Sequence, residues 1–141
     1  MKFNNKNGTA IVEFAIVLPL LFLLLMGIIE FSLVLYDKAV LTNASREGAR
    51  AGIVSQSPRV TDADIRTVVK NYCQTFLITF GADILEDADI TISPASRDGL
   101  PFGSDLTVTL NYRYDFLVLP SFMTIAIGPI NLAAQTLMKL E

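Results

Sequence analysis

Two carboxylates, Glu13 and Glu30, lie inside an otherwise apolar stretch near the N-terminus. A carboxylate costs about 2.5–3.5 kcal/mol at the centre of a bilayer and less near its edge. Glu13 therefore has two interpretations: it reaches water at the membrane edge, or it pairs with a cation. Cleavage of the chain after Gly8 would create such a cation, the α-amine of Thr9, within the same chain or on a neighbouring subunit.

Little else in the sequence points to catalysis. The chain has no histidine, which removes the commonest general base and metal ligand. It has no metalloprotease, nucleophile-elbow, phosphate-loop or dinucleotide motif, and its one cysteine, Cys73, permits no intrachain disulfide. Cys73 lies in an apolar stripe, which favours a buried thiol over a reactive or palmitoylated one. We expect a protein that is not an enzyme and needs no cofactor.

An acidic segment offers a second kind of chemistry. Its carboxylates would suit a hard cation such as calcium, but their spacing lacks the pattern of an EF-hand loop. A solvated acidic connection is the favoured interpretation, and no metal site is predicted. The acidic residues are Asp83, Glu86, Asp87 and Asp89.

The element that positions Glu13 is a long apolar helix. From Thr9 to Tyr36 it would measure about 42 Å, against about 30 Å for the core of a bilayer. Pro19 lies within it, and membrane helices tolerate proline. Lys2 and Lys6 in the preceding leader favour a cytoplasmic N-terminus, so the rest of the chain would lie outside.

The pattern of Gly8, then Glu13, then an uncharged helix resembles the class III signal peptides of type IV pilins. Together with the following REGAR run, it is similar to the TadE-like (TadE/TadG) family of pilin-like proteins from Flp-type, tight-adherence (type IVb-like) pilus systems. The N-terminal third carries the strong match, and the C-terminal strand matches weakly. The matching residues are Gly8, Glu13, Phe14, Pro19, Gly27, Glu30, Phe31, Asn43, Arg46, Glu47, Gly48, Ala49 and Arg50.

The resemblance implies a structural role in pilus assembly. It implies that a prepilin peptidase cuts between Gly8 and Thr9, and that other pilins and the Tad machinery are partners in a homo- or hetero-oligomer. It places the chain in the inner (cytoplasmic) membrane, with possible incorporation into an extracellular pilus. Loss of residues 1–8 would leave nine basic and 14 acidic residues, a net charge of −5, which argues against nucleic-acid binding.

We expect the helix to continue through residues 37–54. Ala44, Gly48 and Gly52 lie four apart, a spacing that lets helices approach closely. Packing within the chain is the favoured interpretation, with contact to a partner as the alternative. On the same stretch, Glu47 faces Arg50 three residues later, and these charges with Arg46 either form weak surface pairs or dock a neighbour. Phe14 and Pro19 are further candidates for helix packing.

The remaining sequence predicts a small head. A capping box at Thr61 and Asp64 begins an amphipathic helix with an apolar stripe from Ile65 to Phe80, which Gly81 would end. Alternating patterns predict strands over 89–93, 106–116 and 130–140, with turns over 94–103. The apolar run 116–127 is too short to span a bilayer. It predicts a short helix from about Pro120, packed in the core by default, with the membrane surface or a neighbour as alternatives.

The predicted fold class is α+β: a long N-terminal transmembrane helix that extends into a head, where a second helix packs on about three antiparallel strands. The predicted parts are a leader (1–8), a transmembrane and assembly helix (9–36), its extension (37–54) and an extracytoplasmic head (55–141). The predicted function is that of a minor pilin or pseudopilin in contact with the lipid bilayer. The alternative is a single-pass membrane protein, outside any filament, whose outer domain binds a partner or ligand.

Overall fold

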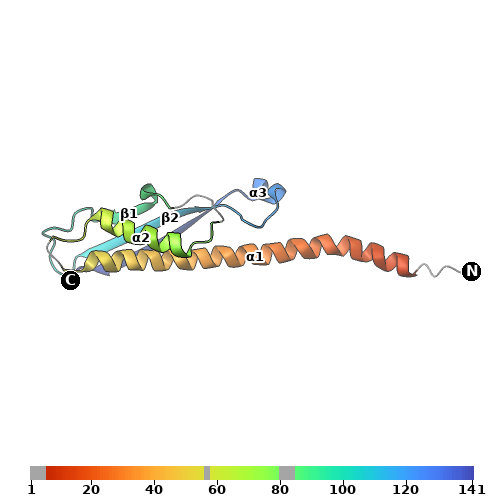
Figure 1. Ribbon diagram of the computed structural model, residues 1–141, viewed down its shortest axis with the longest axis horizontal. Coiled ribbons are helices and arrows are strands. Elements are labelled where there is room, and N and C mark those ends of the chain that lie inside the picture. Colours follow the sequence, from red (N-terminus) through yellow and green to blue (C-terminus); the bar gives the residue numbers. More distant parts are fainter. Residues whose placement is uncertain (1–5, 56–57, 80–84) are drawn as a thin grey trace, which may run out of the picture.

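The computed structural model describes residues 6–55, 58–79 and 85–141. One helix, α1 (Lys6–Ile53), runs the whole length of the molecule and continues without a break through Pro19. The head covers only the C-terminal half of α1, and the N-terminal half projects away from it (Figure 1). The predicted α+β class and the long apolar helix are therefore confirmed.

The head contains one antiparallel sheet of three strands in the order β1-β2-β3. The strands are β1 (Ile90–Ser93), β2 (Asp105–Tyr114) and β3 (Ile130–Lys139). Strand β2 alternates buried and outward residues, as expected for a sheet with one covered face. Asp105 pairs with Lys139 at one end of the β2–β3 ladder and Tyr114 with Ile130 at the other. The short helix α3 (Ser121–Ile127) connects these two strands.

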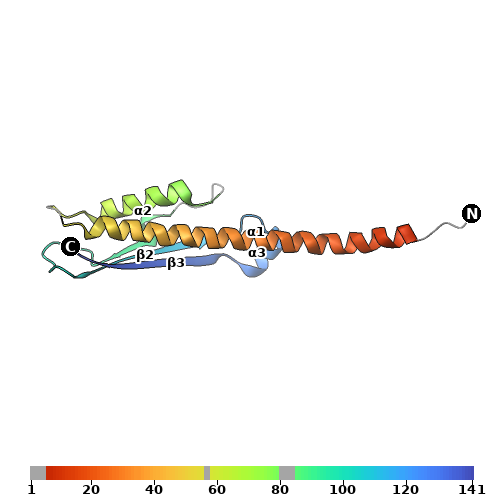
Figure 2. The same ribbon diagram turned by 90° about the horizontal axis from the view of Figure 1, so that it is seen from below.

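The core lies where α1, α2 (Asp62–Phe76) and the sheet meet (Figure 2). A Cβ atom added to Gly48 would lie 2.5 Å from Val69 Cγ2 of α2 and 3.6 Å from Val108 Cγ1 of β2. The absence of a side chain at this position therefore allows α1 to approach both elements. The fully buried side chains around it include Leu41, Ala44, Ile65, Val69, Leu106, Val108 and Leu110.

The start of α2 is the predicted one. Thr61 and Asp64 form the capping box, in which Asp64 accepts from the Thr61 N–H at 3.0 Å and the Thr61 hydroxyl accepts from the Asp64 N–H at 3.2 Å. Arg97, from the loop before β2, is buried against this helix start, where its guanidinium contacts Asp62 and the Val60 carbonyl.

The predicted end of α2 is wrong. The helix ends at Phe76, because Leu77 has an extended backbone and the next N–H, of Ile78, donates to Asp37 Oδ1 on α1 at 3.1 Å. A tertiary contact thus overrides the apolar periodicity that predicted a longer helix. Phe80 and Gly81, the last stripe residue and the predicted terminator, lie outside the described residues.

The expected core position of the 116–127 run is also wrong for its helical part. Helix α3 begins directly after Pro120, as predicted, but three of its apolar side chains are well exposed: Phe122, Ile125 and Ile127. Phe116 and Leu117, earlier in the run, do pack against the core. Apolar content alone did not distinguish these two environments.

Candidate functional site

Glu30 forms the most concentrated polar contact between α1 and the head. Its side chain is only 2% exposed, although it lies within the apolar part of the helix. Glu30 Oε1 accepts hydrogen bonds from the Tyr114 hydroxyl at 2.6 Å and from the Leu117 N–H at 2.9 Å. Oε2 accepts from the N–H groups of Val118 at 2.7 Å and Leu119 at 3.1 Å. One carboxylate thus receives four donors from the end of β2 and the segment before α3.

This geometry explains how an acidic group can be buried without a cation. Buried polar groups are tolerated when they are hydrogen-bonded, and bonds to a charged acceptor contribute about 1.5–3 kcal/mol each. The same bonds also give partners to the backbone N–H groups of residues 117–119, which follow the end of β2 at Tyr114 and are not paired in the sheet. Burial, followed by the hydrogen bond to Glu30, raises the pKa of Tyr114, which therefore remains a donor at neutral pH.

Glu30 also marks where the head begins to cover α1. From Gly8 to Ile29 no side chain is buried, and from Glu30 onward buried or half-buried residues recur every three or four positions on one face. Asp37, two turns after Glu30, is the next buried acid on this face. Its Oδ1 accepts a hydrogen bond from the Ile78 N–H. Its Oδ2 is buried without a hydrogen-bond partner among the residues that the structure describes.

The residues predicted for processing and assembly lie far from Glu30, on the projecting half of α1. Gly8 and Thr9 are in the first turns of the helix, and the Glu13 and Phe14 side chains are exposed. Space is open around Gly8, where an added Cβ atom would have no neighbour within 4 Å. Pro19, also exposed, completes this group. None of these side chains contributes to the buried contacts of the head.

The small residues on the other half of α1 face the head. Ala44 is fully buried, and a Cβ atom added to Gly52 would lie 2.6 Å from both Ile65 Cδ1 and Leu106 Cδ2. With Gly48, these residues form the seam on which α2 and β2 pack. In this chain the small-residue spacing therefore accommodates the protein's own head.

The charged residues of the same stretch lie on the outer side of α1. Arg46 and Arg50 are exposed, and Arg50 Nη1 lies 4.0 Å from Glu47 Oε1, the pair expected from the helical spacing. Exposed pairs of this kind contribute little to stability. Their side chains remain accessible to a neighbouring molecule.

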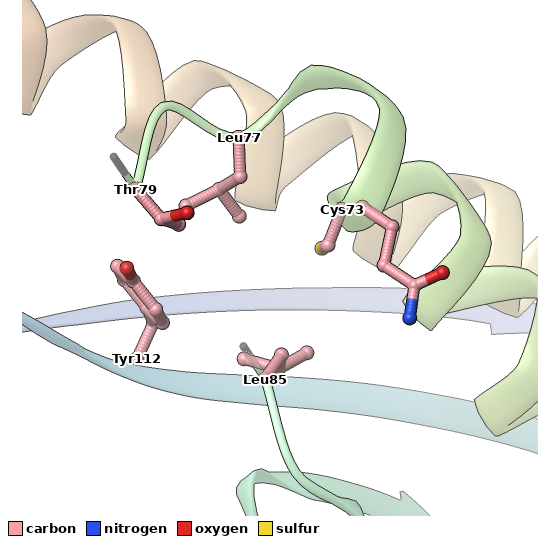
Figure 3. Close-up of a pocket in the computed structure, with 6 residues that line it drawn as sticks. Cys73, Leu77, Thr79, Leu85 and Tyr112 are labelled. Carbon is pink, nitrogen blue, oxygen red and sulfur yellow. The ribbon is translucent and has the colours of Figure 1, made fainter. Parts of the chain in front are cut away.

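Cys73 is buried under α2 and borders a cavity of about 260 Å³ (Figure 3). Burial, followed by the nearby charge of Asp37, raises the pKa of its thiol to about 11. The thiolate is therefore scarce at neutral pH, and the thiol behaves as a small apolar group. The cavity lies between α2 and the sheet, with Leu77 on one side and Leu85 and Tyr112 on the other.

The acidic segment contacts α2. Asp87 pairs with Lys70, its carbonyl accepts from Arg66, and Asp89 accepts from the Glu86 N–H at 2.9 Å. Asp83 lies outside the described residues. Within residues 6–55, 58–79 and 85–141, no group of three or more potential ligands is placed to hold a metal ion.

Glu30 carries part of the family resemblance, but it is not among the candidate site residues predicted from the sequence. The signal that could have singled it out is the pair of acids Glu30 and Asp37, seven residues apart on a helix and thus on one face. An acid on the face that the head covers needs donors from the head.

We expect Glu30→Gln to loosen the segment before α3. The amide NH₂ group cannot accept a hydrogen bond. If it replaces Oε2, the Val118 and Leu119 N–H groups lose their acceptor, and if it replaces Oε1, the Tyr114 hydroxyl and the Leu117 N–H do. Each buried donor left without an acceptor destabilises the segment by about 1–3 kcal/mol. Amide hydrogen exchange on the full chain in micelles should become about thirtyfold faster at 117–119, the factor for about 2 kcal/mol. Glu47→Gln, at a partly exposed acid of the same helix, is the control. Equal exchange in the two variants would contradict the anchoring role.

One family model matches the chain, and it covers α1 almost to its end. No curated protein and no solved structure matches. The matched segment contains Gly8, Glu13, Glu30 and the run from Arg46 to Arg50, so it includes both the projecting half of α1 and its contacts with the head. The finding agrees with the resemblance drawn from these residues. Residues 8–50 match the family described as TadE-like protein, a family of Tad pilus assembly.

Proposed function

We propose that this chain is a pilin-like structural subunit, a minor pilin or pseudopilin, in the assembly of a Flp/Tad adhesive pilus. The observation that carries the proposal is the projecting half of α1. It is long and apolar enough to cross a membrane. No residue of its 18-residue apolar stretch is buried by the rest of the chain. A helix of this kind needs either lipid or other helices around it.

In the proposed mechanism, both environments are used in turn. The precursor is inserted with residues 1–8 in the cytoplasm, and a prepilin peptidase cuts between Gly8 and Thr9. Neighbouring apolar helices then replace the lipid around α1 as subunits assemble. The head, fixed to the other half of the helix by Glu30, remains outside the inner membrane.

Glu13 has a specific part in this mechanism. Its exposed position, one turn after Thr9, lets its carboxylate meet the new α-amine of Thr9, in the same chain or in a neighbour. Within a bundle of apolar helices, an unpaired charge is costly and a paired charge fixes the register. The pair would therefore select one axial alignment of adjacent subunits.

Processing is tested with the native precursor. Intact mass should show loss of Met1–Gly8 when the chain is expressed with the prepilin peptidase of its own system. Gly8→Phe should retain all 141 residues, although open space at Gly8 leaves the helix unperturbed. Gly27→Phe, at another glycine of α1 with open space around it, should be trimmed normally. An untrimmed wild-type chain would contradict the pilin proposal and favour a tethered head outside any filament.

Assembly is tested at Glu13. Glu13→Ala should be trimmed normally but should reduce the subunit in sheared-pilus fractions by about tenfold or more, because it removes the carboxylate proposed to fix the register of adjacent helices. Glu13→Asp, which retains the charge, should recover part of the loss. Asp98→Ala, at an exposed acid of the head, controls for general effects of substitution. Wild-type piliation in Glu13→Ala would refute the pairing.

A further inference from the structure

Helix α3 exposes an apolar surface that the head does not use. Phe122 is 67% exposed and Ile125 is 84% exposed, and their spacing of three residues puts them on one face of the helix. The sequence between Asp115 and Lys139 contains no charged residue. An exposed surface of this composition is typical of a contact with another protein or with a membrane.

The position of α3 favours the membrane. Of the elements of the head, α3 lies furthest toward the N-terminus of α1, and both views place it beside the middle of that helix (Figures 1 and 2). It begins two residues after Leu119, whose N–H is bound to Glu30. The anchor at Glu30 therefore determines the level of α3 along the axis of α1.

Glu30 lies at the expected edge of the bilayer. The uncovered segment from Thr9 to Ile29 is about 31 Å long at about 1.5 Å per residue, which matches a hydrocarbon core of about 30 Å. Helix α3 therefore lies near the expected edge of the bilayer, where α1 also exposes apolar side chains such as Ile28 and Phe31.

We propose that α3 is a second membrane contact, in which Phe122 and Ile125 insert into the boundary between headgroups and acyl chains of the outer leaflet. Because the segment carries no charge, the attraction is hydrophobic and needs no anionic lipid. The contact holds the head at a fixed tilt against the bilayer while the subunit awaits assembly. It depends on α1 spanning the membrane and is independent of cleavage after Gly8.

The chain contains no tryptophan, so a single introduced tryptophan reports on one position. Phe122→Trp is the probe, and Phe102→Trp is the matched control. Phe102 is also well exposed, at 85%, but lies at the opposite end of the head, where the neighbouring Gly103 N–H bonds to the Leu140 carbonyl. The full chain of each variant is reconstituted in phosphatidylcholine vesicles, with and without bromine on the acyl chains.

We expect brominated lipid to quench Phe122→Trp at least about threefold more than Phe102→Trp, and Ile125→Trp to behave like Phe122→Trp. The quenching should persist on tenfold dilution of protein in lipid and should not require anionic lipid. Equal quenching at positions 122 and 102 would overturn the proposal. Shielding of Phe122→Trp from aqueous acrylamide that disappears on dilution would assign the surface to a second copy instead, and would also overturn it.

Discussion

The structure depends on a carboxylate that is buried without a cation. Glu30 lies on a helix that is otherwise apolar at this level, and it is stable there because four donors from the head converge on its two oxygens. The interaction works in both directions. The head supplies hydrogen-bond donors to the Glu30 carboxylate. The carboxylate in turn accepts from the N–H groups of residues 117–119, which lie beyond the end of β2 and have no partner in the sheet. Among the described residues, every hydrogen bond that the Glu30 carboxylate accepts comes from Tyr114 or from residues 117–119.

This constraint divides α1 into two halves with different surroundings. On the C-terminal side, small residues such as Gly48 and Gly52 let α2 and the sheet approach the helix closely. On the N-terminal side, the helix is exposed, apolar and about as long as a bilayer core is thick. The head buries no side chain between Gly8 and Ile29, so the exchange of lipid for neighbouring helices that we propose would not require the head to change.

Local patterns in the sequence predicted most of the elements. Apolar residues at helical or alternating spacing depend on near neighbours, and they indicated α1, the start of α2, the three strands and the short helix after Pro120. The contact of Glu30 with residues 117–119 links positions more than 80 residues apart, and no local pattern encodes it. The end of α2 was mispredicted for the same reason, because Asp37 on α1 accepts a hydrogen bond from the N–H of Ile78.

The exposed surface of α3 shows a different limit. Phe122 and Ile125 would satisfy a protein core as well as a membrane surface, so composition alone favoured the commoner environment. Only the position of α3 beside the middle of α1 distinguishes the two. For Gly8 and Glu13 the limit is chemical: their predicted roles begin with a cleavage that creates a new amine at Thr9, and that amine does not exist in a chain that includes Gly8.

The central claim is that Glu30 joins the head to the membrane-spanning helix. It is tested most directly by a double-mutant cycle between Glu30→Ala and Tyr114→Phe, with unfolding free energies measured on the full chain in micelles. A hydrogen bond from the Tyr114 hydroxyl to a buried carboxylate predicts a coupling free energy of about 1.5–3 kcal/mol. Additive effects of the two substitutions, with a coupling below about 0.5 kcal/mol, would contradict it.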